Sequence, residues 1–243
     1  MPTRSRGEAF ELIRSNIDRH GHHIYLVAPS GPLPRWAYTI GLDKSGDLVL
    51  AGASAFLADD VERIINECAE HLSASSDWSK VELDIPDLGA FQLRQVDASW
   101  IQSLLLGATD FYGRDSIQAL QIVPDKQHWT IDVPDLSKAW EASLEPVWQW
   151  LQNPWMFDVP PRSTATTNLA ALRGERVTEA ARWEEDQWEL FAGAGPDVPK
   201  KDLRVVPLGT LLAADLSLAA VAQLDVGGAL WRDQECGQWQ KWG

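Results

Sequence analysis

Histidine is the residue type whose spacing in this chain comes closest to a metal site. His20 and His22 stand at alternate positions, so on an extended strand they could share a metal if a carboxylate or a third histidine joined them. The other candidates are His71 and His128, and the sequence has no His-x-x-Glu-His or Cys-x-x-Cys spacing. We therefore expect no metal and no other cofactor, and we keep His20 and His22 as the weak candidate ligands of an alternative.

Tyr38 and Thr39 are the candidates for polar contact with a small ligand. They lie on an expected strand, and Gly41 would permit close approach of a ligand. Alternation places Trp36 and Tyr38 on one face of that strand and Ala37 and Thr39 on the other. A core strand with one satisfied hydroxyl explains the pattern better. Since no Walker, dinucleotide-binding or nucleophile-elbow pattern is present, we assign no catalytic residue and expect no enzyme.

Two acidic groups are the candidate partner-binding residues. One falls in the first turns of a helix, where carboxylates also favour the helix dipole. The other forms the expected tip of a hairpin beside a tryptophan, which would give an aromatic anchor with a charged rim. The candidates are Asp59, Asp60, Glu62, Trp183, Glu184, Glu185 and Asp186.

The composition favours a protein partner over nucleic acid or a membrane. The chain has 243 residues, 35 acidic against 21 basic, a net charge of −14, and 13 tryptophans. Such a charge repels phosphate backbones but steers a basic partner. No apolar run approaches the roughly 20 residues that span a bilayer, and we see no signal peptide. We expect a cytoplasmic protein whose two cysteines, Cys68 and Cys236, are reduced.

Hydrophobic periodicity predicts helices and short strands in the first two thirds of the chain. Ser54 is expected to cap the clearest helix, which buries Cys68. Residues 117–123 alternate apolar and polar types and predict a half-buried strand. The expected helices are 6–19, 54–72, 100–106 and 136–151, and the expected strands are 24–27, 36–42, 48–51, 81–85, 90–96 and 117–123.

A proline-rich stretch followed by small polar residues predicts a boundary between two modules. We expect an α+β fold of two small modules, each a mostly antiparallel sheet packed with helices. The modules would cover residues 1–155 and 169–243, joined by a linker or long loop at 156–168. In the second we expect a hairpin from 177 to 191, a strand at 203–206, helices at 208–214 and 215–222, and a strand at 229–231.

The first module resembles a bacterial family known as domain of unknown function 4262. The resemblance is carried by His20-Gly21, the apolar strand at 24–27, and residues 36–42, which read Trp-Ala-Tyr-Thr-Ile-Gly-Leu. It continues in Ala-Leu-Gln at 119–121 followed by Pro-Asp at 124–125, and it covers roughly residues 8–135. Two features depart from the pattern: His22-His23 replaces an aromatic residue, and Gly46-Asp47 replaces Pro-Glu. The resemblance implies a fold and no chemistry.

The second module is similar to an immunity-protein domain of bacterial polymorphic-toxin systems. That resemblance implies binding to a toxin. An acidic residue usual after the glycine of that pattern is absent here. The matching residues are Trp188, Phe191, Gly193, Val206, Leu208, Leu211, Leu212 and Asp215.

The sequence therefore leads to one main functional hypothesis and two alternatives. The main hypothesis is an immunity protein that neutralises a cognate toxin with a basic surface, in competition between bacteria that use systems such as type VI secretion. The first alternative is a small-molecule-binding domain or metal-dependent enzyme with His20, His22, Tyr38 or Thr39 in its pocket. The second is an accessory structural protein without a toxin partner.

Overall fold

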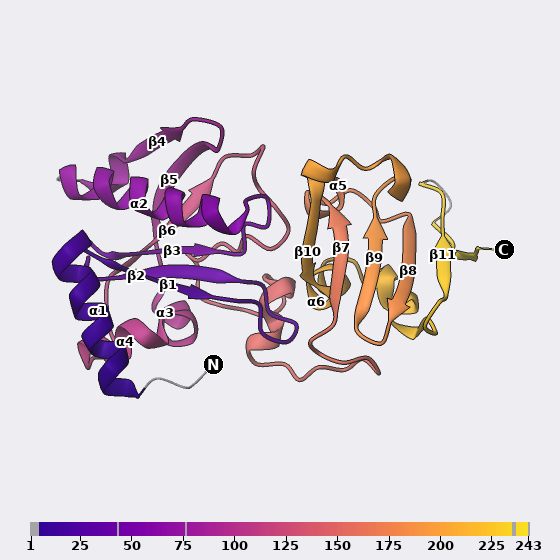
Figure 1. Cartoon of the computed structure of the whole chain (residues 1–243), viewed down its shortest axis with the longest axis horizontal. Helices are drawn as coiled ribbons and strands as arrows, with labels where there is room; N and C mark the ends of the chain where they lie inside the picture. The colour runs from indigo at the N-terminus through magenta and orange to yellow at the C-terminus, as the bar shows by residue number, and fades with distance from the viewer. Residues whose placement is uncertain (1–4, 43, 76, 235–236, 243) are drawn as a thin grey trace.

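The computed structural model describes residues 5–42, 44–75, 77–234 and 237–242, and it contains two six-stranded mixed sheets (Figure 1). This confirms the expected α+β fold with mostly antiparallel sheets. Cys236 lies outside the described residues. None of the described helices is long and apolar enough to cross a membrane.

The first sheet has the strand order β1-β2-β3-β6-β5-β4, with β3 and β6 parallel and the other neighbours antiparallel. Its elements are α1 (Arg6–His20), β1 (His23–Val27), β2 (Trp36–Ile40), β3 (Asp47–Ala51), α2 (Ala58–Ala74), the 3₁₀ helix η1 (Trp78–Lys80), β4 (Glu82–Ile85), β5 (Gly89–Gln95), α3 (Ala98–Leu104), α4 (Leu106–Tyr112) and β6 (Ala119–Pro124).

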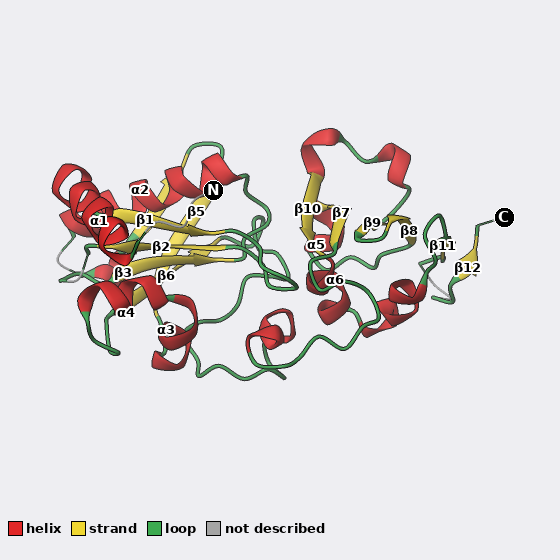
Figure 2. Cartoon of the chain, turned by 60° about the horizontal axis from the view of Figure 1, so that its bottom comes forward, coloured by secondary structure: helices red, strands yellow, loops and turns green. Residues whose placement is uncertain are grey.

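Helices cover both faces of this sheet, which is why its central strands are apolar on both sides. α2 packs on one face, against side chains that include Leu48 and Leu50. α1, α3 and α4 pack on the other face, against side chains that include Tyr38 and Val49. Figure 2 shows α2 and the α3–α4 pair on opposite sides of the strands.

The second sheet has the order β10-β7-β9-β8-β11-β12, with β7 and β9 parallel. α5, α6 and η5 cover one face with leucines, and Figure 2 shows α5 and α6 below the strands. Its elements, with the segment that precedes it, are η2 (Pro146–Leu151), β7 (Thr164–Asn168), α5 (Leu169–Leu172), β8 (Glu179–Glu184), β9 (Gln187–Phe191), η3 (Gly195–Asp197), η4 (Lys200–Asp202), β10 (Leu203–Pro207), α6 (Leu208–Ala214), η5 (Leu216–Gln223), β11 (Ala229–Trp231) and β12 (Gln240–Lys241).

The packed cores of the two sheets meet along the connecting segment. Trp148 is fully buried in the first core, and that cluster includes Ala213 of α6. Trp150 packs against the first core and Trp155 against the second, with ring centroids 5.1 Å apart. Residues 164–168, which we expected to belong to a linker, form β7, an inner strand of the second sheet between β10 and β9. Only the proline-rich part before them is irregular.

Three local predictions were wrong. Ser54 does not cap α2; its hydroxyl donates to Asp132, and the Asp60 carboxylate accepts the Leu57 N–H at 2.8 Å instead. The expected helix at 136–151 is reduced to the 3₁₀ helix η2, which begins at Pro146. β6 is buried along its whole length rather than half-buried, because both faces of the sheet are covered; the amide of buried Gln121 donates to Pro134 O and accepts the Leu136 N–H.

Candidate partner-binding site

The first acidic candidate group lies at the start of α2. Asp59 and Glu62 are exposed, whereas Asp60 is half-buried and its carboxylate accepts the Leu57 N–H. Asp60 thus stabilises the start of the helix by capping it. Asp59 and Glu62 remain free to face solvent or a partner.

The second candidate group lies at the β8–β9 turn. Trp183 is 58% exposed, and Glu184 and Glu185 are exposed. Asp186 is half-buried and pairs with Arg162, Nε to Oδ2 at 2.9 Å. The hairpin belongs to the second sheet and α2 to the first, so the two predicted groups do not form one surface (Figure 1).

Trp183 instead borders a cavity of about 530 Å³ on the second sheet, on the face opposite to the leucine-covered one. We call this cavity the tryptophan hollow. It is lined by Thr166, Glu179, Ala180, Ala181, Trp183, Glu189, Phe191, Gly195, Leu203, Ala229 and Trp242.

Small residues on neighbouring strands make the floor of the tryptophan hollow. Glu189 of β9 stands opposite Thr166 on one side and opposite Ala181 on the other, and Ala181 in turn stands opposite Ala229. All four side chains are half-buried. The short side chains of Thr166, Ala181 and Ala229 leave space above the sheet. The carboxylate of Glu189 is the one charged group in this row of four residues.

The C-terminal tail supplies a wall of the tryptophan hollow. The Trp242 N–H donates to Ala229 O at 3.2 Å, and the Trp242 side chain is 55% exposed. Glu179, which also lines the hollow, accepts the Gly195 N–H through Oε2 at 2.8 Å, and this bond holds the loop after β9. Two exposed indoles and two carboxylates therefore converge on one concave apolar surface.

Sequence reasoning found Trp183 but missed Glu189, Glu179 and Trp242. One signal was available for Glu189. It alternates with Trp188 and Leu190, both fully buried, so strand periodicity places Glu189 on the opposite face. No sequence signal places Trp242 beside β8, because that proximity depends on the pairing of β11 with both β8 and β12.

The structure does not bring the histidines of segment 20–23 together around a metal site. His20 is exposed at the end of α1, and His22 Nε2 lies 3.0 Å from Asn66 Oδ1. Burial lowers the pKa of His22 despite that hydrogen bond, and burial also lowers the pKa of His23. Within the described residues, no three His, Cys, Asp or Glu side chains converge as metal ligands would.

Tyr38 and Thr39 are occupied by the fold. The Tyr38 hydroxyl accepts the Gly107 N–H at 3.0 Å, and burial raises the pKa of this phenol. Thr39 is fully buried; its hydroxyl donates to Asp47 and accepts the Leu48 N–H. Their faces are those expected from alternation, with Ala37 in one core cluster and Tyr38 in the other.

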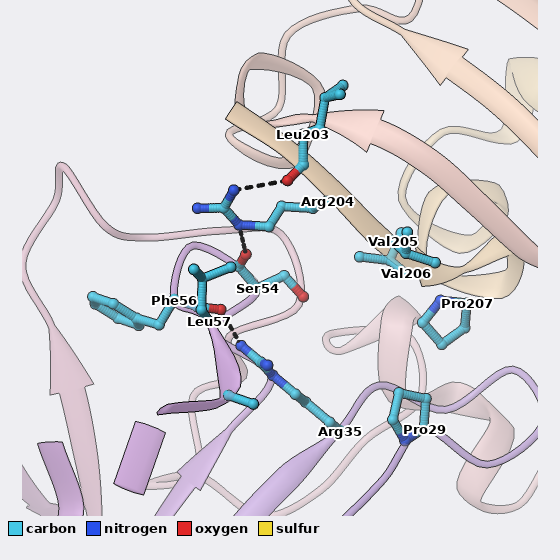
Figure 3. A pocket seen from close by; sticks show the side chains of 11 residues that line it. Pro29, Arg35, Ser54, Phe56, Leu57, Leu203, Arg204, Val205, Val206 and Pro207 are labelled. Carbon is cyan, nitrogen blue, oxygen red and sulfur yellow. Dashed lines mark hydrogen bonds between the residues drawn. The ribbon is translucent and has the colours of Figure 1, made fainter. Parts of the chain in front are cut away.

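A second cavity, about 310 Å³, lies between the sheets and carries two arginines (Figure 3). Arg204 of β10 reaches across to the loop after β3: its Nε donates to Ser54 O at 3.0 Å and its Nη2 to Ala55 O at 2.6 Å. Its Nη1 donates to Lys201 O and Leu203 O. Arg204 thus ties the second sheet to the first.

Arg35 holds the same loop from the first sheet. Its Nη2 donates to the carbonyls of Ala53 and Phe56, while its Nε is buried without a hydrogen-bond partner among the described residues. Burial lowers the pKa of both arginines, and Asp60 opposes that effect in each. The two arginines of this cavity therefore hold residues 53–57 in place, and the Arg35 Nε–H is the one buried donor of theirs that stays unsatisfied among the described residues.

Comparison with known proteins gives one match. No curated protein and no solved structure matches the chain. A family model described as a domain of unknown function (DUF4262) matches residues 16–129, the segment that runs from the last turns of α1 through β6. The chain therefore contains a DUF4262 domain, built on its first sheet.

Proposed function

We propose that this chain is an immunity protein that binds a toxin with a basic surface and neutralises it by covering the toxin's active site. The observation that carries the proposal is the tryptophan hollow. A concave surface with two half-exposed indoles and carboxylates on its floor and rim is suited to a protein partner, because indoles anchor interfaces and carboxylates select basic side chains.

The charge of the whole molecule supports the same kind of partner. A net charge of −14 accelerates the encounter with a basic protein and slows it with an acidic one. By count, residues 1–158 hold 23 acidic and 12 basic residues, so most of the excess lies in the first two thirds of the chain. Steering would come from the whole chain, and anchoring from the hollow.

The residues that resemble an immunity domain lie behind the tryptophan hollow rather than in contact with a partner. Trp188 of β9 and the α6 residues Leu208, Leu211 and Leu212 are all buried in the core of the second sheet. They build the covered face of the second sheet, whose other face carries the hollow. The resemblance therefore concerns the scaffold, and the proposed contact surface consists of other side chains.

Co-expression with toxin genes sought in the neighbourhood of this gene tests the proposal. We expect the chain to protect cells and to form a complex with the toxin. The double variant Trp183→Ala/Trp242→Ala should lose both protection and the complex while remaining folded. The matched control is Leu144→Ala, because Leu144 is an apolar side chain of similar exposure (62%) outside the hollow. Equal cell death with and without the chain, and no complex, would contradict the proposal.

A second candidate function, binding of a small molecule, has one observation in its favour. The buried Nε of Arg35 has no described acceptor, and Arg35 borders both the cavity between the sheets and an apolar cavity of about 290 Å³ beside α2. A small carboxylate would satisfy that donor. Thermal unfolding with acetate, butyrate and hexanoate tests this: a stabilisation that Arg35→Gln abolishes supports it, and no shift with any of them refutes it.

A further inference from the structure

We infer that the tryptophan hollow accepts an arginine side chain of the partner, with Glu189 as its charge partner and the indoles of Trp183 and Trp242 as its apolar contacts. The inference rests on the proposed function in that the arginine belongs to the bound protein. It goes further by naming the group recognised and the residue that selects it.

Glu189 is the first reason. Its side chain is half-buried in a mostly apolar cavity, and no described residue donates a hydrogen bond to its carboxylate or pairs with it. A carboxylate without a partner beside apolar walls gains from an incoming cation. The adjacent Thr166 and Ala181 are short enough to leave the carboxylate accessible from above.

Two arginines of this sheet, Arg182 and Arg204, are turned away from the hollow, and Lys241 of β12 stands opposite the buried Leu230 rather than among the lining residues. Arg182 turns to the covered side, where its guanidinium stacks on Trp188 and its Nη1 donates to Leu224 O at 2.7 Å. Arg204 points to the first sheet, where it donates to Ser54 O. The hollow therefore keeps the negative charge of Glu189 and Glu179 for a ligand.

The indoles of Trp183 and Trp242 are the second reason. Elsewhere in the second module, two arginines already lie over tryptophan rings in the geometry that we expect for the partner's arginine. The guanidinium of Arg182 lies 4.6 Å from the ring centroid of Trp188, and that of Arg232 lies 4.2 Å from the ring of Trp239. Within the described residues, neither Trp183 nor Trp242 has such a cation. The indoles of Trp183 and Trp242 and the carboxylate of Glu189 could therefore bind a guanidinium supplied by a partner in the same geometry.

Arginine fits this site better than lysine. A guanidinium is planar, so it can stack on an indole while it offers two parallel N–H groups to a carboxylate. An ammonium is a point charge with a stronger hydration shell, and it would lose more of that shell in an apolar hollow. We therefore expect the hollow to discriminate between the two cations as well as against a neutral side chain.

The test uses the whole chain and three peptides of the form acetyl-Gly-Gly-X-Gly-Gly-amide, with X arginine, lysine or the neutral isostere citrulline. Binding is followed by two-dimensional NMR of the indole N–H signals, assigned with Trp183→Phe and Trp242→Phe. We expect the arginine peptide to shift the Trp183 and Trp242 signals, the lysine peptide to bind more weakly, and the citrulline peptide to bind about tenfold more weakly or not at all.

Two charge variants separate the hollow from general attraction to an acidic protein. Glu189→Gln should weaken binding of the arginine peptide roughly tenfold, whereas Glu70→Gln, which removes the same charge from the exposed surface of α2, should leave binding unchanged. Indole spectra and thermal unfolding show whether both variants remain folded. Equal binding of arginine and citrulline, equal effects of the two variants, or unshifted Trp183 and Trp242 signals would each overturn the inference.

These results are separable from the proposed function. If the toxin complex forms but the arginine peptide fails, the anchor is wrong and the immunity role stands. If the peptide binds as expected but no toxin complex forms, the anchor stands and the immunity role is wrong.

Discussion

Replacing Arg232 by methionine should destabilise the second sheet and its C-terminal tail. The Arg232 side chain is fully buried and makes three hydrogen bonds: Nε to Val177 O at 2.6 Å, Nη1 to Ser217 Oγ at 2.6 Å, and Nη2 to Asp215 Oδ2 at 3.0 Å. Its guanidinium also stacks on Trp239. Arg232 therefore connects β11, the start of η5 and the tail that carries Trp242.

The structure sets the expected magnitude for Arg232→Met. Removing one partner of a buried ion pair costs about 3–5 kcal/mol, because the other charge is left uncompensated. The Asp215 side chain is 35% exposed, so water would partly solvate the carboxylate left behind. We therefore expect a loss of about 3 kcal/mol in the free energy of unfolding at pH 7.

This loss should depend on pH in a defined direction. Burial opposes the charge of Asp215, but hydrogen bonds from Ser217 and the ion pair with Arg232 outweigh burial and lower the pKa of this carboxyl. A carboxylate with a lowered folded-state pKa contributes fully above its unfolded value of about 3.9, and its contribution disappears as pH falls through the folded-state value. The difference between the two proteins should therefore shrink below about pH 4.

Urea unfolding followed by tryptophan fluorescence measures both effects. The control is Arg176→Met, since Arg176 is an exposed arginine of the same module with one hydrogen bond, to Gln234 O, and should change stability by about 0.5 kcal/mol or less. A double-mutant cycle with Asp215→Asn isolates the pair. A loss under about 1 kcal/mol for Arg232→Met, or no coupling in the cycle, would refute the reasoning.

Three further predictions follow from buried groups and tight contacts. Burial raises the pKa of the Cys68 thiol to about 12, so in a Cys236→Ser background native protein should not react with a thiol reagent at pH 8, and labelling should require unfolding; rapid native labelling would contradict this. Gly52→Ala should cost about 3 kcal/mol, because Gly52 has φ 67° and an added Cβ would lie 2.0 Å from Asp132 O, whereas Gly113→Ala, at φ 63° in open space, should cost about 1 kcal/mol by calorimetry. Arg204→Met should lower the free energy of unfolding in urea by about 2 kcal/mol. Arg204→Lys should not restore this stability, because the bonds to Ser54 O and Ala55 O come from two different nitrogens of the guanidinium. Full rescue by lysine would argue that Arg204 does not join the two sheets in this way.

The fold was largely predictable because its strands and helices are short and strongly patterned. The clearest case is α2, where residues of the predicted stripe such as Val61, Ile64 and Cys68 are all buried. The prediction of a helix at 136–151 was wrong because the apolar residues of this segment reach the core from successive turns of the chain and not from one face of a helix. Leu136 and Trp148 are fully buried, yet the segment between them is irregular.

Burial was predicted wrongly for polar residues whose side chains form hydrogen bonds inside the core. The glutamines of residues 117–123 looked solvent-exposed by alternation, but Gln121 uses both its amide groups on the backbone of residues 134 and 136. Ser54 looked like a helix cap, but its hydroxyl is held by buried Asp132. In both cases the partner lies far along the sequence, where a local pattern contains no information about it.

The residues that carry the resemblance of the first module to its family have structural roles: they end a helix, allow close packing, or make buried hydrogen bonds. Gly21 ends α1 at φ 82°, and Gly41 allows close approach of the chain, since a Cβ there would lie 2.9 Å from Ile17 Cγ1. Tyr38 and Thr39 are buried and hydrogen-bonded to backbone N–H groups.

A motif of this kind indicates how the first sheet folds and leaves few of its own atoms for a ligand. The tryptophan hollow, in contrast, lies wholly outside residues 16–129, and it includes the exposed indoles of Trp183 and Trp242. The function of this chain should therefore be sought on its second sheet, and chains that share only the first sheet need not share it.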